Sequence, residues 1–282
     1  MISWDKIEEK ANREGVSVPL VLKENVQWLI LDFLFREGAF SDLVFQGGTA
    51  LRIVYRGVRY SEDLDFVLRE KNAALFSGFT RLLGGLPGFL EKNIPFSRQI
   101  RLKAQKETET FKRYSLILET ENLPHLDKTN IEVANVPSYE NEPVLIQDPE
   151  VFVNPVIRVE TPEEILSDKF CAFGSRKYVK GRDLWDIFYL LETMRIPLTE
   201  EGERMVRKKI LDYRLTPEAF GEKFGENLRV LHEKGTEIFE EEMARFLPRA
   251  YRENFAEQTP LILKKVSQAL KSYREQRFNR ES

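Results

Sequence analysis

The chain has 282 residues, of which 42% are hydrophobic and 32% charged, and its formal net charge is −3. This length and composition suit two globular domains and exclude long disordered stretches. The acidic balance argues against a dedicated duplex-DNA binder, which is usually strongly basic. A single cysteine, Cys171, excludes an intramolecular disulfide, and with two histidines a His/Cys zinc site is not expected, so carboxylates must carry any metal.

The first 160 residues are predicted to form a mixed sheet with flanking helices. Apolar residues recur at helical spacing over residues 2–37. A short strand over residues 43–46 then leads into Gly47-Gly48, a short helix over 49–55 and a second strand over 64–68. Further along we expect a helix over residues 72–83, a hairpin of strands 97–106 and 111–120, a strand over 128–136, a loop over 137–142 and a strand over 156–159.

The pattern becomes helical after residue 160. Thr161 can cap a helix, Pro162 suits its first turn, and Glu164 completes a capping box. We therefore predict an α+β fold, with a mixed-sheet domain and N-terminal helices over residues 1–160 and a helical bundle over 161–282. The N-terminus lacks the apolar core of a signal peptide and no apolar run could cross a bilayer, so we expect a cytoplasmic protein without membrane contact.

Two aspartates, Asp63 and Asp65, stand two residues apart at the start of a predicted strand. Side chains at i and i+2 lie on one face of a strand, so both carboxylates point the same way and can share a metal ion. Magnesium prefers such hard oxygen ligands and keeps positions for phosphate oxygens, as attack on an α-phosphorus requires. Glu132, on the predicted strand 128–136, is the candidate third ligand.

Gly47-Gly48 lies where a predicted strand turns into a helix. Glycine lets backbone N–H groups approach phosphate oxygens closely, and Thr49 adds a hydroxyl there. No Walker-type P-loop motif occurs. A Gly-Gly pair is usually a simple turn, and an Asp-x-Asp pair is often a solvated strand end. Their combination within one short stretch is far more specific, and it favours a triphosphate and metal site.

A second group of charged residues lies in the helical part. Lys169 falls on or beside the apolar face of its helix, where it either snorkels to the surface or neutralises a phosphate. Asp183 and Asp186 share a helical face with apolar residues. They belong to a functional site, or they form buried ion pairs with Arg176, Arg182 or Lys169 that fix two helices.

The motifs Gln46-Gly47-Gly48-Thr49-Ala50-Leu51 and Arg59-Tyr60-Ser61-Glu62-Asp63-Leu64-Asp65-Phe66 resemble the AbiEii/AbiGii and MenT-type nucleotidyltransferases. This family is similar to the DNA polymerase β superfamily, and many members are toxins of toxin–antitoxin pairs. The segments 164–169 and 182–186 are similar to its downstream motifs, so that the likeness covers about residues 43–191.

The resemblance implies a role for each matching residue. Metal binding falls to Asp63 and Asp65, and Gly48 and Ser61 would lie beside the triphosphate. Glu132 as third metal ligand, and Gly47 and Thr49 as nucleotide contacts, come from the strand and turn pattern described above. Lys169 would contact the triphosphate, and Asp183 would be a catalytic or structural acid. Arg59, Arg182 and Asp186 are further candidates. The triphosphate is then expected between the sheet domain and the helical domain.

The resemblance also suggests the acceptor. It implies magnesium-dependent transfer of a nucleoside monophosphate from an NTP to RNA, at the 3′ end of tRNA, by a toxin with a cognate antitoxin. The alternatives are nucleotidylation of a protein or a small molecule, or a non-catalytic regulator that binds nucleotide or a partner. Three groups of cations could bind an RNA backbone, or could simply form solvated faces. The first lies on or near the predicted hairpin, the second near the predicted site and the third in the C-terminal tail. They are Arg98, Arg101, Lys103, Lys106, Lys112 and Arg113; Arg176, Lys177, Lys180 and Arg182; and Lys264, Lys265, Lys271, Arg274, Arg277 and Arg280.

Overall fold

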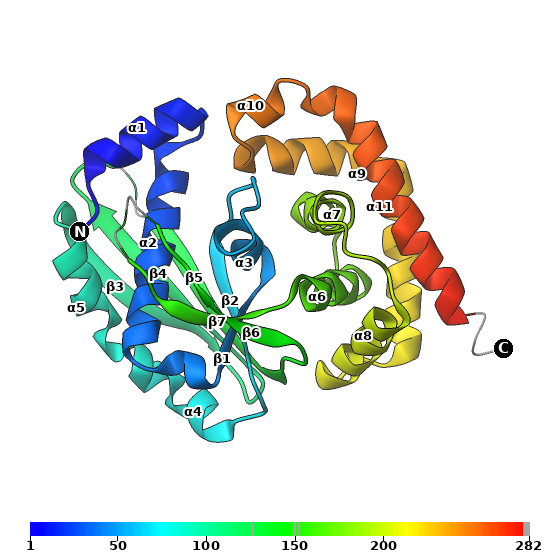
Figure 1. Cartoon of the computed structure of the whole chain (residues 1–282), viewed down its shortest axis with the longest axis horizontal. Helices are drawn as coiled ribbons and strands as arrows, with labels where there is room; N and C mark the ends of the chain where they lie inside the picture. Colours follow the sequence, from blue (N-terminus) through cyan, green and yellow to red (C-terminus); the bar gives the residue numbers. More distant parts are fainter. Residues whose placement is uncertain (124, 126, 149–150, 152, 279–282) are drawn as a thin grey trace. The chain divides into compact units, whose positions relative to one another are not determined.

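The computed structural model describes residues 1–123, 125, 127–148, 151 and 153–278. The chain divides into two compact units, Met1–Glu160 and Thr161–Ser282, and Figure 1 labels the elements of both. The first unit combines helices with a mixed sheet and the second is helical. The predicted α+β class is confirmed.

The first unit is built on a seven-stranded sheet of the described residues, in the order β3-β4-β5-β2-β1-β7-β6. Strand β2 pairs antiparallel with β1 and parallel with β5, and β1 pairs parallel with β7. The candidate aspartates therefore lie on a central strand. The strands are β1 (Leu43–Gln46), β2 (Asp63–Leu68), β3 (Ser97–Glu107), β4 (Phe111–Thr120), β5 (Asp127–Pro137), β6 (Asn141–Leu145) and β7 (Val156–Glu160).

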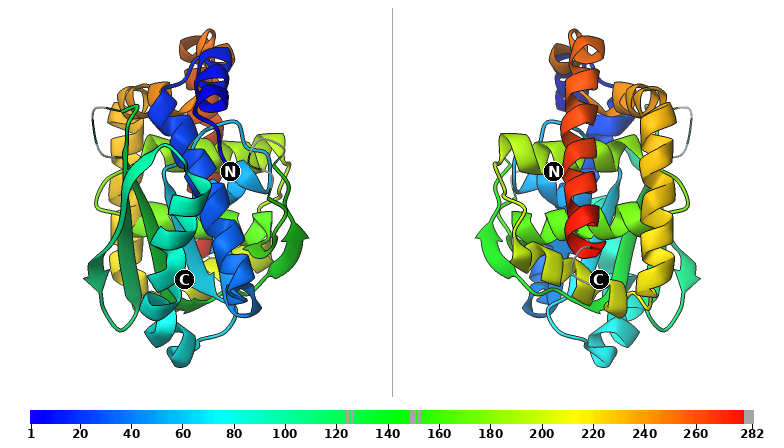
Figure 2. Two further views of the ribbon diagram at one scale, coloured as in Figure 1. Left: turned by 90° about the vertical axis from the view of Figure 1, so that its left-hand side faces the viewer. Right: turned by 90° about the vertical axis from the view of Figure 1, so that its right-hand side faces the viewer.

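One face of the sheet is covered by helices. Leu64, Tyr114 and Ile131 are register neighbours on this face and all three are buried. Figure 2 (left) shows helices in front of it, and Phe79 of α4 packs on Tyr114 at 5.9 Å between ring centroids. Asp63 and Asp65 alternate with buried Leu64 along β2 and so face the opposite way. The helices of this unit are α1 (Trp4–Glu14), α2 (Val18–Arg36), η1 (Ala39–Ser41), α3 (Gly47–Ile53), α4 (Ala73–Leu82), η2 (Leu83–Gly85) and α5 (Leu86–Asn93).

Three elements differ from their predictions. The helical region over residues 2–37 is two helices, because Gly15 adopts the left-handed conformation (φ 65°) that ends α1. After Gly84 and Gly85 the chain resumes as α5, with a proline in its first turn. The predicted loop over 137–142 runs into β6, which contains Pro143 and lies at the sheet edge, where a missing N–H is tolerated.

The second unit is held together by aromatic side chains. Phe173 and Phe224 pack edge to face at 5.0 Å, and Phe239 stacks on Phe255 at 5.2 Å. Figure 2 (right) shows α9 in yellow to orange and α11 in red, and the two helices are in contact. The elements are α6 (Pro162–Ser175), α7 (Gly181–Phe188), the π-helical turn η3 (Tyr189–Thr193), α8 (Glu200–Asp212), α9 (Pro217–Phe246), α10 (Arg249–Arg252) and α11 (Phe255–Phe278).

Within the described part of the chain, no helix is both long and apolar enough to span a bilayer. Of the basic tail residues, Arg280 lies outside the described residues.

Candidate active site

The turn from β1 into α3 brings Gly47 against Asp65. Gln46, the last residue of β1, is the register partner of Asp65, and Gly47 has φ 79°. A Cβ atom on Gly47 would stand 2.8 Å from Oδ2 of Asp65. Both the backbone conformation and the lack of space therefore require glycine here. The predicted glycine turn and the Asp-x-Asp strand are neighbours in space.

Gly48 makes room for the guanidinium of Arg59. A Cβ atom on Gly48 would stand 2.0 Å from Nη2 of Arg59. Arg59 is 4% exposed, and its Nη1 donates to the carbonyl of Tyr60 at 3.0 Å. The second glycine is thus explained by a buried cation at the first turn of α3. Nucleotide contact by Gly47, Gly48 or Arg59 stays a prediction.

Thr49 links α3 to the start of β2. Its buried hydroxyl donates to the backbone carbonyl of Asp63. Ser61, two residues before Asp63, is buried too, and its carbonyl accepts a hydrogen bond from Gln27 at 3.0 Å. Both residues therefore fix the backbone that presents Asp63. Contact of their hydroxyl groups with nucleotide stays a prediction.

The carboxylate of Asp63 is oriented by two polar side chains from the next strands. Asn130 is its register partner on β5 and donates from Nδ2 to Oδ1 of Asp63 at 2.9 Å. Ser115 on β4 donates to Oδ1 of Asn130 at 2.7 Å, which sets the direction of the amide. Sequence analysis missed Asn130 because a single asparagine in a strand carries no signal until the register is known.

Glu132 is the register partner of Asp65 on the neighbouring strand, so the two carboxylates lie side by side on one sheet face. Its Oε1 also pairs with Arg113 of β4 at 2.7 Å. The side chain of Arg113 is 47% exposed and that of Glu132 is 16% exposed, so water reaches the ion pair from the arginine side and weakens it. Asp63, Asp65 and Glu132 therefore offer hard oxygen donors suited to a divalent cation.

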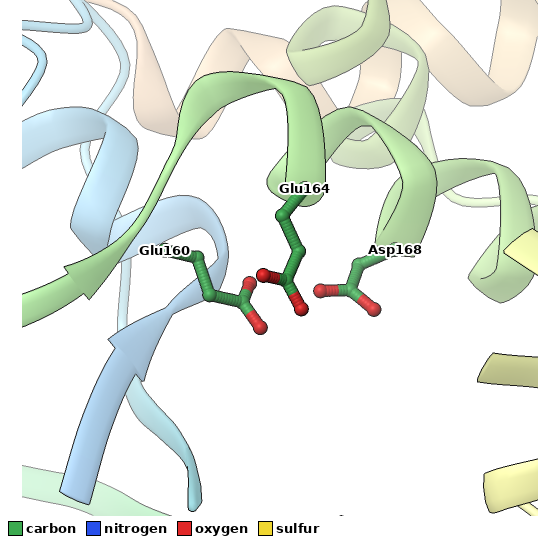
Figure 3. Close-up of side chains that lie close together, drawn as sticks. All are labelled: Glu160, Glu164 and Asp168. Atoms are coloured by element: carbon green, nitrogen blue, oxygen red, sulfur yellow. The ribbon is translucent and has the colours of Figure 1, made fainter. Parts of the chain in front are cut away.

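The structure gathers another set of acids more closely. Glu160, Glu164 and Asp168 follow one another at four-residue intervals where β7 leads into α6, and Figure 3 shows their side chains. Among the described residues, this is the set whose three ligand oxygens lie within 4.8 Å of one another. The ammonium of Lys209 on α8 is 2.8 Å from both Glu164 and Asp168. A buried cation therefore already pairs with two of these carboxylates, and we interpret them as structural.

Lys169, Asp183 and Asp186 form a buried ion cluster within the second unit. The ammonium of Lys169 lies 3.1 Å from Oδ1 of Asp183 and 2.7 Å from Oδ2 of Asp186. Arg176 adds a contact of 2.6 Å to Oδ2 of Asp183. Of the two alternatives from the sequence, the structure shows the ion pairs that fix α6 to α7. A contact of Lys169 with nucleotide is not tested.

The cluster predicts a pH dependence of stability. Burial alone would raise the pKa of Asp183, but the charges of Lys169 and Arg176 outweigh it and lower the pKa to about 2. An unfolded Asp titrates near 3.9, so the carboxylate contributes about 2 kcal/mol above that pH. This contribution is lost as the pH falls through the folded pKa. Urea unfolding of wild type and Asp183→Asn should show a stability difference that narrows between about pH 5 and pH 2. A constant difference would contradict the assignment.

Arg182 lies on the same helix as Asp183 but pairs elsewhere. Its Nε is 2.7 Å from Glu242 of α9, and its guanidinium carbon is 4.8 Å from the ring centre of Phe246. Gly181 allows this packing, because a Cβ there would stand 2.9 Å from the carbonyl of Ile238. These contacts of Arg182 join α7 to α9, and its role at a nucleotide stays a prediction.

A buried network that sequence analysis missed supports the loop before Asp63. Glu24 of α2 accepts from Arg52 at 2.6 Å and pairs with Lys10 at 2.8 Å. Burial alone would raise the pKa of Glu24, but Arg52 and Lys10 outweigh it and lower the pKa. Arg52 also donates to the carbonyls of Gly57 and Val58. The sequence does not reveal this network, because a charged residue such as Glu24 in an apolar helix forms no recognisable pattern. In the structure its partner Arg52 anchors the loop at Gly57 and Val58.

Comparison with known proteins gives the geometry a context. A family model described as "Nucleotidyl transferase AbiEii toxin, Type IV TA system" matches residues 29–275. No curated protein matches the chain. Two solved structures are similar over nearly the whole chain.

The first is described as a "putative nucleotidyltransferase from H. pylori"; it has 18% sequence identity and a TM-score of 0.56, and the match covers 93% of this chain and 98% of that one. The second, JHP933 from Helicobacter pylori, has 19% sequence identity and a TM-score of 0.48, and the match covers 94% of this chain and 97% of that one. At such identity the first likeness shows a shared fold.

Proposed function

The chain belongs to the AbiEii family of nucleotidyltransferase toxins from type IV toxin–antitoxin systems, and we propose that it transfers a nucleoside monophosphate from an NTP to RNA, at the 3′ end of tRNA, with Mg²⁺. The family implies a cognate antitoxin and an NTP substrate. The observation that carries the proposal is the sheet face where half-buried Asp63 and Asp65 lie beside Asn130 and Glu132 and next to the Gly47 turn.

The proposed reaction is a displacement at the α-phosphorus. A hydroxyl oxygen of the acceptor gives up its proton to solvent water and forms the new P–O bond, the bond to the bridging oxygen breaks, and diphosphate leaves with that electron pair. Magnesium would neutralise the phosphate oxygens and lower the pKa of the attacking hydroxyl. Asp63 and Asp65 would hold the ion, with Glu132 exchanging its pairing with Arg113 for a metal contact. Asn130 keeps the Asp63 carboxylate in its orientation.

Asn130 is a positioning residue in this proposal. Asn130→Ala should reduce transfer by about 10- to 100-fold, the usual effect of losing a group that orients a metal ligand. The loss should be partly recovered at high Mg²⁺ concentration, because orientation affects how tightly the metal binds. Ser115→Ala, one step further from Asp63, should have a smaller effect in the same titration. If Asn130→Ala shows an unchanged Mg²⁺ dependence, the residue has no role in metal binding.

We extend the proposal to Lys169 as a triphosphate contact and to Asp183 as the acid that orients it. Lys169→Arg keeps a positive charge beside Asp183 and Asp186. The planar guanidinium group does not, however, reproduce the contact that a compact ammonium makes with a phosphate. We expect the KM for NTP to rise about tenfold. A purely structural lysine would leave that KM unchanged and alter only the urea midpoint, which is measured on the same variant.

A transfer assay tests the function itself. Purified protein is incubated with Mg²⁺, each of the four labelled nucleoside triphosphates in turn, and total tRNA. We expect label on RNA and none with Asp63→Asn. Label on a protein or a small molecule, with none on RNA, would overturn the acceptor. If no acceptor is labelled and Asp63→Asn retains the cellular effect of the wild type, the chain acts as a binding regulator instead.

A further inference from the structure

The sheet register places the candidate aspartates in rows that cross four strands. Asp63 on β2 is followed by Asn130 on β5, Ser115 on β4 and Lys103 on β3. Directly paired residues on neighbouring strands share a face. Lys103 therefore lies on the same face as Asp63, about 14 Å away at the usual strand spacing.

The neighbouring rows continue this pattern. From Asp65 the row runs through Glu132 and Arg113 to Lys106, with a register shift between Ala104 and Lys106. On the other side, Lys128, Ile117 and Arg101 form a row from β5 to β3. We call the exposed cations of these rows the basic sheet face: Arg101, Lys103, Lys106, Arg113 and Lys128.

Edge protection is a rival explanation, since lysines often block an exposed edge strand such as β3. The distribution of charge argues against it. Along β3 the opposite face carries Ile100 and Leu102, whereas Arg101, Lys103 and Lys106 lie on the face of Asp63. Arg113 and Lys128 lie on interior strands, where there is no edge to protect.

An aromatic ring lies among these cations. Phe111 of β4 is half-buried and lies two residues from Arg113, hence on the same face. The ammonium of Lys106 is 5.5 Å and the guanidinium carbon of Arg113 is 5.8 Å from its ring centre. Cations interleaved with an aromatic side chain are typical of surfaces that bind single-stranded nucleic acid, where phosphates meet the charges and bases stack on the ring.

We propose that the basic sheet face binds the phosphate backbone of the acceptor, as a single strand of RNA whose 3′ end reaches Asp63 and Asp65. This inference rests on the proposed function, because it assigns the acceptor of that reaction to a surface. It places the strand along the rows from β3 towards β2. Among the described residues of β2, β3, β4 and β5, the register places four carboxylates on this face: Asp63, Asp65, Glu132, which pairs with Arg113, and Glu119, opposite Gln99.

The test measures RNA binding separately from transfer. Binding of a labelled single-stranded RNA of about twelve nucleotides is followed by fluorescence anisotropy, with Asp63→Asn as the background to prevent turnover. The triple variant Arg101→Gln, Lys103→Gln, Lys106→Gln should bind at least about tenfold more weakly. Its plot of log K against log salt should be shallower by about 2, since each phosphate contact on a single strand contributes about 0.7.

The matched control removes three exposed charges elsewhere in the first unit: Lys6→Gln, Arg69→Gln and Lys92→Gln. It should bind RNA with the wild-type affinity and salt dependence. Equal affinity of the triple variant and this control would overturn the proposal, as would a loss of binding without a change in salt slope. If RNA binding falls as expected while the transfer assay labels no RNA, the surface stands and the proposed acceptor reaction fails. The two results are therefore distinguishable.

Discussion

Asp63→Asn should lower nucleotidyl transfer by a factor on the order of 10³ or more, with little change in stability. A metal-bound phosphate gains several kcal/mol of charge stabilisation in the transition state, and each 1.36 kcal/mol is tenfold in rate. The amide keeps the size of the carboxylate and can still hydrogen-bond to Asn130, but it removes the negative charge that would hold the cation. Transfer rates at saturating NTP, measured across a range of Mg²⁺ concentrations, give the effect.

Glu70→Gln is the matched control for this substitution. Glu70 is an exposed carboxylate just beyond the other end of β2, so its conversion to an amide changes the net charge equally. We expect its activity to equal that of the wild type. Comparable losses in the two variants, or wild-type activity of Asp63→Asn, would show that Asp63 does not bind the metal.

Part of this geometry could be predicted from the sequence because it depends on local patterns. The strand Leu43–Gln46 was predicted with its exact ends, and alternation placed Asp63 and Asp65 on one face. Thr161 also caps α6 as expected, accepting from the backbone N–H of Glu164 at 3.3 Å. Turn glycines, caps and two-residue periodicity are visible without any knowledge of tertiary structure.

Other parts depend on pairings between distant segments and were not predictable. Glu132 was identified from its own strand, but its position opposite Asp65 and its pairing with Arg113 follow from the register. The sequence predicts a capping box for Glu164, but not that its carboxylate pairs with Lys209 on a later helix. In the sequence Lys209 cannot be distinguished from the other charged residues of α8, because tertiary packing decides which acids it pairs with.

The same lysine carries a large predicted effect on stability. Lys209 is 1% exposed, and it forms ion pairs with buried Glu164 and with Asp168. Lys209→Met preserves the length of the side chain but leaves two carboxylates without that charge. Breaking a buried ion pair from one side costs about 3–5 kcal/mol. Urea unfolding at neutral pH should show this loss, whereas Lys208→Met, at an exposed neighbouring position, should change stability by less than about 0.5 kcal/mol.

A second variant separates ion pairing from metal binding at these acids. Suppose that Glu164 and Asp168 form ion pairs with Lys209 and do not bind metal. The triple variant Lys209→Met, Glu164→Leu, Asp168→Leu should then recover much of the stability that Lys209→Met loses, because replacing buried ion-pair partners together by apolar residues is often neutral or stabilising. Any effect of Mg²⁺ on the unfolding midpoint should then be the same in the wild type and in the triple variant, since the Lys209 ammonium already lies 2.8 Å from both carboxylates. A midpoint that rises with Mg²⁺ in the wild type, and does not rise in the triple variant, would instead make Glu164 and Asp168 metal ligands and would move the metal away from Asp63.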